Sequence, residues 1–244
     1  MKKIFIFDLD DTLTESRTPI YGEMAELLCA LLKKASVAVI SGASFEQFEK
    51  QLIQNIPCAE LFSKLFIIPT NGAELWEFDK NKKWRRLYSY ELQPDLRKKI
   101  IEKIAAIAHI PKDRVNYFID DLKTQVTYSA LGIDAPIEEK IKFDPDEKKR
   151  RDFVRKIAAD FPELSFEIAG RTSINVIMKN IDKAFGIKKL LEHTQLKASD
   201  ALFIGDALYQ GGNDEEARKA GEDVVATTGP EETKKIILNI LSSL

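Results

Sequence analysis

Three carboxylates lie within four positions near the N-terminus, at Asp8, Asp10 and Asp11. They follow Ile4 to Phe7, an unbroken apolar run that is typical of a strand covered on both faces. Ligands of open α/β sheets bind at the carboxyl ends of such strands. Because neighbouring carboxylates repel one another, we expect a cation to hold them, and a hard divalent ion such as Mg²⁺ prefers oxygen ligands. Taken alone, the pattern fits an ordinary strand-to-helix turn equally well.

Further reactive side chains follow other apolar runs. One run ends at Ser41 and a later one ends at Asp206, while Lys183 opens a helical stretch between them. A glycine pair then precedes Asn213 and Asp214. Each residue has an ordinary explanation by itself, since Ser41 and Asp214 would also serve as helix caps and Lys183 as a surface cation. Their order along the chain, with the acids and the hydroxyl at strand ends, favours a single site to which all of these residues contribute.

This order resembles the haloacid dehalogenase superfamily of phosphohydrolases, whose motifs are DxDx[TV], a Ser or Thr, a Lys and a paired acid. Within it, the chain is most similar to members with a large inserted cap (subclass IIB), namely eukaryotic-type phosphomannomutases and related sugar-phosphate phosphatases. The similarity covers nearly the whole chain, and the segments that carry it are 12–17, 68–73, 127–132 and 205–214.

The resemblance implies catalytic roles for the motif residues. Asp8 would attack phosphorus and form an aspartyl-phosphate. Asp10 would protonate the leaving oxygen and then activate the attacking water. Lys183 would supply positive charge, and Ser41 with the backbone N–H of Gly42 would hold phosphoryl oxygens.

The resemblance also implies a Mg²⁺ site. Asp8 and Asp206 would bind the ion through carboxylates and Asp10 through its backbone carbonyl, while Asn213 and Asp214 would orient metal-bound waters. The metal is needed because a phosphate monoester dianion repels a carboxylate nucleophile.

Substrate contacts are expected from several segments, again by resemblance to the mutases. Arg17 and Asn71 belong to the motif-bearing part of the chain, and Ser173 and Asn175 to a strand of the cap, where Asn175 replaces the family's Asp. Arg114 is a further cap candidate, although a surface position in a turn explains it nearly as well.

Two differences from the mutase sequences bear on which reaction is expected. The mutases carry arginines in the cap where Leu122 and Ile133 stand, and Lys123 cannot make the bidentate contact of an arginine. A bisphosphate intermediate would then be held more weakly, and water would compete for the aspartyl-phosphate. The sequence therefore favours a sugar-phosphate phosphatase, with a phosphomannomutase as the alternative. A non-catalytic binding module would have no need of the complete motif set.

Composition excludes several other classes. The 244 residues carry a net charge of −2, so no basic footprint for nucleic acid is present. No apolar run is long enough to span a membrane, and no signal peptide is visible. Cys29 and Cys58 are expected to form neither a disulfide framework nor a metal site, which suits a reducing compartment and predicts a cytoplasmic protein. The expected partner is a small phosphosugar, and the expected state is a monomer or a cap-mediated homodimer.

Alternating strands and helices predict an α/β fold with a Rossmann-like parallel-sheet core, formed by residues 1–81 and 181–244. Residues 82–180 are predicted to form an inserted α+β cap domain that selects the substrate. The predicted cap elements are helices at 94–108 and 146–159 and strands at 115–119, 124–129, 164–168 and 173–178.

Overall fold

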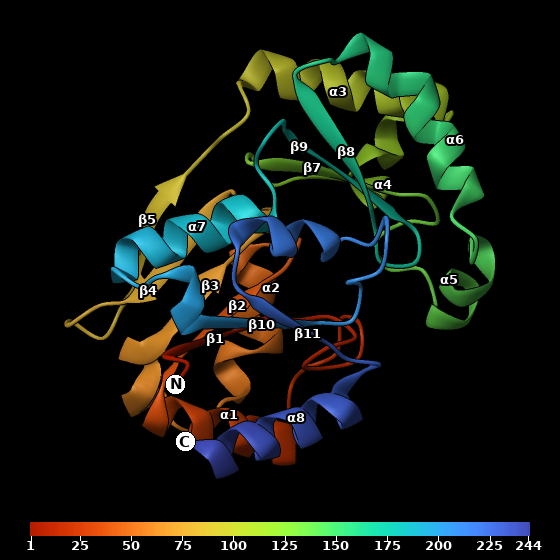
Figure 1. Cartoon of the computed structure of the whole chain (residues 1–244). Helices are drawn as coiled ribbons and strands as arrows, with labels where there is room; N and C mark the ends of the chain where they lie inside the picture. Colours follow the sequence, from red (N-terminus) through yellow and green to blue (C-terminus); the bar gives the residue numbers. More distant parts are fainter. The chain divides into compact units, whose positions relative to one another are not determined.

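The computed structural model describes all residues from 1 to 244 and divides into two compact units. The core comprises Met1–Ser89 and Ile181–Leu244, and the cap comprises Tyr90–Asn180 (Figure 1). None of the helices is both long and apolar enough to cross a membrane.

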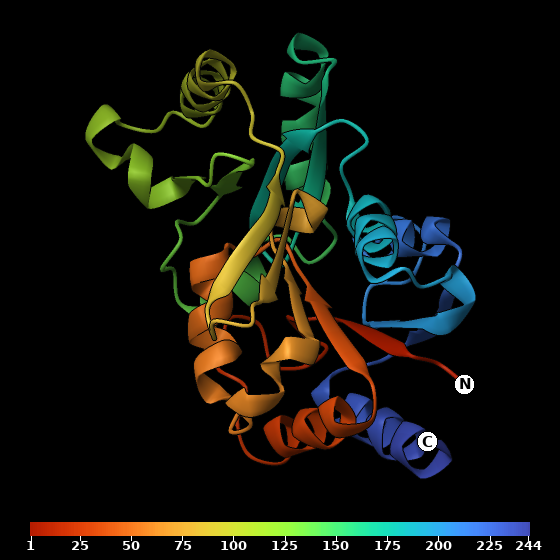
Figure 2. The same cartoon turned by 90° about the vertical axis from the view of Figure 1, so that its left-hand side faces the viewer.

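A seven-stranded sheet in the order β11-β10-β1-β2-β3-β4-β5 forms the centre of the core. Strands from β11 to β3 run parallel, and β4 and β5 form an antiparallel hairpin at the edge that faces the viewer in Figure 2. The strands are β1 (Ile4–Asp8), β2 (Ser36–Ile40), β3 (Leu65–Ile68), β4 (Glu74–Phe78), β5 (Trp84–Ser89), β10 (Ala201–Gly205) and β11 (Asp223–Ala226).

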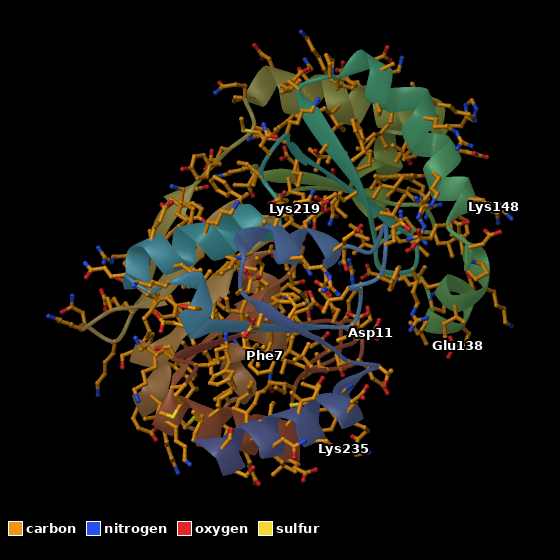
Figure 3. The ribbon with its side chains drawn as sticks, viewed as in Figure 1. Phe7, Asp11, Glu138, Lys148, Lys219 and Lys235 are labelled. Carbon is orange, nitrogen blue, oxygen red and sulfur yellow. A yellow bond between two sulfur atoms is a disulfide. The ribbon has the colours of Figure 1, made fainter.

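Helices cover both faces of this sheet because successive strand residues point to opposite sides. Phe5 and Phe7 belong to the apolar cluster shared with α1, α2 and α8, and Phe7 lies in this layer in Figure 3. Ile4 and Ile6 belong to the cluster shared with α7. The helices are α1 (Glu23–Lys34), α2 (Phe45–Gln51), α7 (Lys183–Thr194) and α8 (Pro230–Ser243). Short 3-10 helices are η1 (Ile53–Asn55), η2 (Ala59–Lys64), η3 (Thr70–Gly72), η6 (Ala198–Asp200) and η7 (Glu215–Ala220).

The first boundary between the units differs from the predicted one. The predicted break after residue 81 would place β5 in the cap, but β5 pairs with β4 from Phe78↔Trp84 to Glu74↔Ser89 and so belongs to the core sheet.

The cap is built on a four-stranded antiparallel sheet in the order β6-β7-β9-β8. Its strands are β6 (Ile119–Asp121), β7 (Gln125–Ser129), β8 (Leu164–Ala169) and β9 (Ser173–Met178). Its helices are α3 (Pro94–Ile107), η4 (Lys112–Arg114), α4 (Val115–Phe118), α5 (Ile137–Phe143), α6 (Lys148–Ile157) and η5 (Ala158–Asp160). Val126 and Val176 on one sheet face share an apolar cluster with Ile100 of α3 and Ile157 of α6. The alternate positions of β7 are polar, and those of β9 are polar at Ser173 and Asn175 and apolar at Ile177.

One cap prediction is wrong, and one cap helix was missed. The strand predicted over 115–119 is the short helix α4, with β6 beginning only at Ile119. Val115, Phe118 and Ile119 have the i, i+3, i+4 spacing of a helix as well as the composition of a strand, which explains the error. Helix α5 was not predicted.

The prediction for the cysteines is also wrong, because Cys29 of α1 and Cys58 form a disulfide. Both side chains lie in the apolar cluster between α1 and the sheet. The bond joins residues separated by 29 positions and closes a loop that contains β2 and α2.

Candidate active site

A buried lysine lies between two carboxylates at the carboxyl end of β1. The Nζ atom of Lys183 is 2.5 Å from Oδ1 of Asp8 and 2.5 Å from Oδ1 of Asp214. Asp8 is the last residue of β1, and Lys183 is the first residue of α7. All three side chains are at least nine-tenths buried. Residues that are 175 and 31 positions from the lysine are thus brought to one point.

Two local features place Lys183. Asp182 caps α7, because its Oδ1 atom accepts the N–H of Phe185 at 2.7 Å. The helix then approaches η3 very closely, since a Cβ atom at Gly186 would lie 2.7 Å from Cα of Gly72. Only glycine permits this approach, which sets the distance of α7 from the strand ends.

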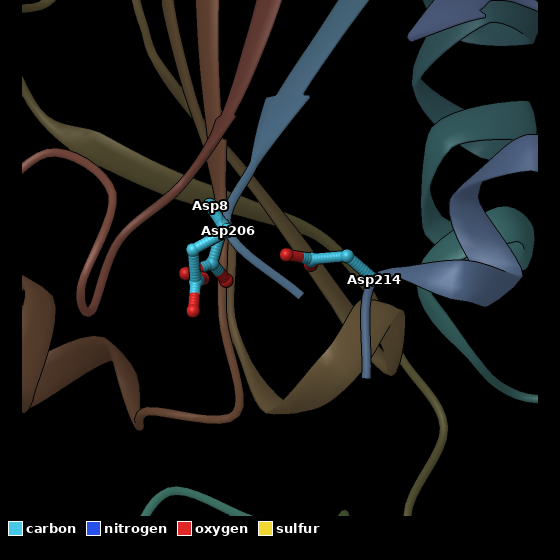
Figure 4. Close-up of side chains that lie close together, drawn as sticks. All are labelled: Asp8, Asp206 and Asp214. Carbon is cyan, nitrogen blue, oxygen red and sulfur yellow. The ribbon is translucent and has the colours of Figure 1, made fainter. Parts of the chain in front are cut away.

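Asp206 and Asp214 are held by different contacts. Asp206 follows β10, and its Oδ1 atom accepts the hydroxyl of Thr12 at 3.2 Å. Asp214 is fully buried, and its Oδ2 atom accepts the N–H of Ala207 at 3.0 Å while Oδ1 faces Lys183. Figure 4 shows the carboxylates of Asp8, Asp206 and Asp214 converging.

These carboxylates can hold a divalent metal. One oxygen from each of Asp8, Asp206 and Asp214 lies within 4.8 Å of the other two. Ligand atoms on opposite sides of Mg²⁺ are about 4.2 Å apart, given bonds of about 2.1 Å. Lys183 compensates one of the three negative charges, so the group keeps a charge that matches a divalent cation. Carboxylate oxygens are donors that Mg²⁺ prefers, and the three side chains would close around the ion by about 0.6 Å at most to reach the distance between opposite ligands. The Asp214 side chain belongs to the group, and the Asp10 side chain does not.

The charges in this cluster depend on one another. Burial raises the pKa of Asp8, and the carboxylates of Asp214 and Asp206 add to the rise while Lys183 opposes it. Burial and Asp214 raise the pKa of Asp206 to about 6. Burial alone would lower the pKa of Lys183, but Asp214 and Asp8 outweigh it and raise that pKa, so the lysine stays cationic.

Asp10 lies on the loop after β1, and its side chain bonds to residues outside the cluster of carboxylates around Lys183. Its Oδ1 atom accepts the backbone N–H of Arg17 at 2.7 Å and Nε2 of Gln51 at 3.2 Å. Arg17 itself is exposed. Gln51 was not among the predicted residues, because a single glutamine at a helix end carries no recognisable signal.

The residues predicted to contact the substrate at the ends of β2 and β3 lie side by side. The N–H of Asn71 donates to the carbonyl of Ser41 at 2.9 Å, and the Oγ atom of Ser41 accepts the N–H of Ala43 at 3.2 Å. Both Ser41 and Asn71 are buried, and Gly42 lies between Ser41 and Ala43. Asn213 lies in the turn before Asp214 and is half-buried.

The predicted cap residues divide into two places. Asn175 and Ser173 lie on the polar face of β9, where Oδ1 of Asn175 accepts the Thr127 hydroxyl at 3.1 Å and Ser173 contacts Ser129 at 3.1 Å. Arg114 lies on η4, outside this sheet, and its guanidinium lies 4.8 Å from the ring centroid of Tyr117.

The fold of the chain is shared by solved hydrolase structures, among them one of the haloacid dehalogenase-like class. The structure of an IMP-nucleotidase from Plasmodium falciparum is similar, with a TM-score of 0.72 and 18% identity over 98% of this chain and 70% of that chain. A haloacid dehalogenase-like hydrolase from Bacteroides thetaiotaomicron has a TM-score of 0.67 and 16% identity over 98% of this chain and 100% of that one. At such identities the similarity concerns the fold alone.

Sequence similarity narrows the class further. The family model of eukaryotic phosphomannomutase matches residues 24–243, so the chain belongs to this family. The phosphomannomutase of Encephalitozoon cuniculi is 28% identical over 88% of this chain and 84% of the relative. A probable phosphomannomutase of Caenorhabditis elegans is 28% identical over 100% of this chain and 97% of the relative. Phosphomannomutase 1 of Homo sapiens is 27% identical, with 91% and 86% covered.

Proposed function

We propose that the protein transfers a phosphoryl group on hexose phosphates through an aspartyl-phosphate at Asp8, and that it interconverts hexose 1- and 6-phosphates as a phosphomannomutase. The observation that carries the proposal is the family match, which runs through core and cap. The relatives therefore favour the mutase over the phosphatase that the cap sequence predicts.

The first half-reaction uses the carboxylates at the end of β1. A carboxylate oxygen of Asp8 forms a bond to phosphorus as the bond from phosphorus to the sugar oxygen breaks. Asp10 gives its proton to that sugar oxygen. Lys183 lies 2.5 Å from Asp8 and places a fixed positive charge beside the developing negative charge. Asp8, Asp206 and Asp214 would hold Mg²⁺, which would supply positive charge to the phosphoryl group when bound.

The second half-reaction reverses these steps on a different hydroxyl. Asp10, now ionised, takes the proton of the attacking hydroxyl, and the phosphoryl group passes from Asp8 to that oxygen. A sugar hydroxyl as acceptor yields the isomerised phosphate, whereas water yields free phosphate. The identity of the acceptor alone separates a mutase from a phosphatase.

Polar groups in both units are suited to the substrate. Ser41 and Asn71 lie together at strand ends of the core, beside the backbone N–H groups that bind phosphoryl oxygens. The hydroxyl and amide groups of Ser173 and Asn175 line the polar face of the cap sheet and are suited to sugar hydroxyls. These assignments extend the family resemblance to individual residues of this chain.

A phosphatase is the second candidate, and Leu122 and Ile133 favour it. Leu122 lies in the turn between β6 and β7, where its N–H bonds to the carbonyl of Gln125 at 2.9 Å. Its side chain and that of Ile133 offer no charge to a second phosphate. A bisphosphate would be gripped less firmly than by arginine, which leaves more opportunity for water.

The cofactor, the partner, the oligomeric state and the location of the enzyme are part of the same proposal. Mg²⁺ is the proposed cofactor, a phosphosugar is the proposed partner, and a monomer or cap-mediated homodimer is the proposed state. A cytoplasmic location loses the support of cysteine usage, because the two cysteines form a disulfide.

The test supplies mannose 1-phosphate, glucose 1-phosphate and their 6-phosphates with Mg²⁺, with and without a hexose bisphosphate. Free phosphate and isomerised sugar are measured together. A mutase gives isomerised sugar that depends on the bisphosphate, and Asp8→Asn abolishes it while the protein stays folded. Free phosphate as the main product would establish the phosphatase instead. No turnover of any of these substrates would refute both.

A further inference from the structure

We infer that Gln51 is a positioning residue for Asp10: its amide holds one carboxylate oxygen of Asp10 and so fixes the orientation in which that carboxylate acts on the substrate. The inference rests on the proposed function, in which Asp10 is the general acid and base. Gln51 is the last residue of α2 and is 1% exposed.

The orientation of the Gln51 amide is fixed by its partners. Its Nε2 atom lies 3.2 Å from Oδ1 of Asp10 and 3.2 Å from the carbonyl oxygen of Thr18. The Thr18 carbonyl is an acceptor only, so the nitrogen and not the oxygen of the amide must face it. The Oε1 atom of Gln51 in turn accepts Nε2 of Gln47 at 2.8 Å. The relay from Gln47 through Gln51 to Asp10 therefore has a single direction of donation.

Both hydrogen bonds to the Asp10 carboxylate reach the same oxygen. The N–H of Arg17 donates to Oδ1 at 2.7 Å, and the Gln51 amide donates to it at 3.2 Å. The two bonds therefore restrict rotation of the carboxylate and fix its orientation.

An amide suits this place better than the alternatives. It donates without bringing charge and keeps its donor at every pH, whereas a glutamate would repel Asp10. Gln51 also supports the loop after β1, since its backbone carbonyl accepts the N–H of Ile20 at 2.7 Å. A test must therefore separate positioning from this structural contribution.

Substrates with different leaving groups can separate the positioning of Asp10 from the structural support that Gln51 gives to the loop. A sugar oxygen needs a proton to depart, whereas 4-nitrophenolate and acetate depart without one. We measure single-turnover phosphoryl transfer to the protein with mannose 1-phosphate, and with 4-nitrophenyl phosphate or acetyl phosphate, in wild type and Gln51→Leu. The variant should lose about tenfold to a hundredfold in rate with the sugar phosphate, a part of what general acid catalysis provides. The loss with the activated phosphates should stay under about threefold, since the acid is not used there.

Two further variants keep the result interpretable. Gln47→Leu removes only the group that orients the Gln51 amide, so it should show the same selectivity to a smaller extent, and it serves if Gln51→Leu does not fold. Gln54→Leu, at an exposed position of η1, is the matched control and should behave as wild type.

The outcomes divide cleanly. Equal loss with both kinds of phosphate in folded Gln51→Leu, or no loss with either, overturns the inference and leaves the proposed function standing. A wild-type protein that accepts a phosphoryl group from none of the substrates overturns the proposed function and this inference with it.

Discussion

Asp8→Asn should abolish turnover and at the same time stabilise the metal-free protein. The carboxylate of Asp8 is buried beside two others, and burial is the largest cause of its raised pKa. A group whose ionised form is disfavoured in the folded state costs stability at neutral pH. Asparagine keeps the shape and removes the charge, so the cost is relieved.

Pairwise electrostatics set the scale of this effect. Repulsion between two carboxylate oxygens that lie within 4.8 Å of each other is at least about 3.5 kcal/mol at an effective dielectric constant of 20. Asp8 meets two such neighbours, whereas its attraction to Lys183 at 2.5 Å is about 6.6 kcal/mol on the same scale. These terms nearly cancel, which leaves the relieved desolvation as the net gain, about 2 kcal/mol. For a chain of this length, that raises Tm by about 4 to 8 °C.

The assay is thermal unfolding of wild type and Asp8→Asn, first in EDTA and then over a series of Mg²⁺ concentrations. Because the variant lacks one metal ligand, the wild type should gain more from Mg²⁺, and the order of the two Tm values should reverse as Mg²⁺ increases. Asp11→Asn is the control, because this half-exposed carboxylate accepts the Ser16 N–H and its amide oxygen can do the same. An Asp8→Asn protein that melts several degrees below wild type in EDTA would refute the reasoning, because attraction to Lys183 would then dominate.

Three further predictions concern the rest of the core. The Glu222 carboxylate is buried without a hydrogen-bond partner, and burial raises its pKa from 4.5 to about 7, so its protonated form is favoured on folding and stability declines as pH rises from about 4.5 to 7. Glu222→Gln should therefore raise the free energy of unfolding by roughly 2 kcal/mol at pH 8 and leave it unchanged at pH 4.5, and equal urea midpoints at pH 8 would contradict this. Gly186→Ala should displace α7 from η3 and move Lys183, which should lower kcat and cost about 1 to 3 kcal/mol of stability. Lys188→Ala, at an exposed position of the same helix, is the control. An unchanged kcat in Gly186→Ala would show that the close packing of α7 against η3 is not needed for activity. Reduction of the Cys29–Cys58 disulfide should cost about 3.6 kcal/mol from the entropy of the 29-residue loop, seen as a lower Tm in dithiothreitol that a Cys29→Ser variant does not show. Free thiols in the untreated protein would contradict the last prediction.

Much of the core could be predicted because its signals are local. Four-residue apolar runs between turn residues define buried parallel strands, and the side chain after such a run lies at the ligand-binding edge of the sheet. This is why Asp8 and Asp206 were expected at one edge, and the structure brings their carboxylates together. Helix caps are local in the same way, and Asp182 before α7 is an example.

Other features depend on which elements meet in space. The sequence predicts that β5 belongs to the inserted cap, and only its pairing with β4 assigns it to the core. Val115 to Ile119 fits helix and strand periodicity equally, so its neighbours decide. The disulfide joins two apolar positions whose proximity arises from packing of α1 against the sheet.

The amino-acid sequence by itself determined the strand ends, the acids that follow them and the family. Tertiary structure alone decided that Lys183 touches both Asp8 and Asp214, that the Asp214 carboxylate rather than that of Asp10 joins the charge cluster, and that Gln51 holds Asp10. The physical reason is the separation along the chain over which each kind of interaction acts. Strand and turn preferences act between neighbouring residues, whereas a hydrogen bond between distant residues exists only once packing has set the distance between their backbones.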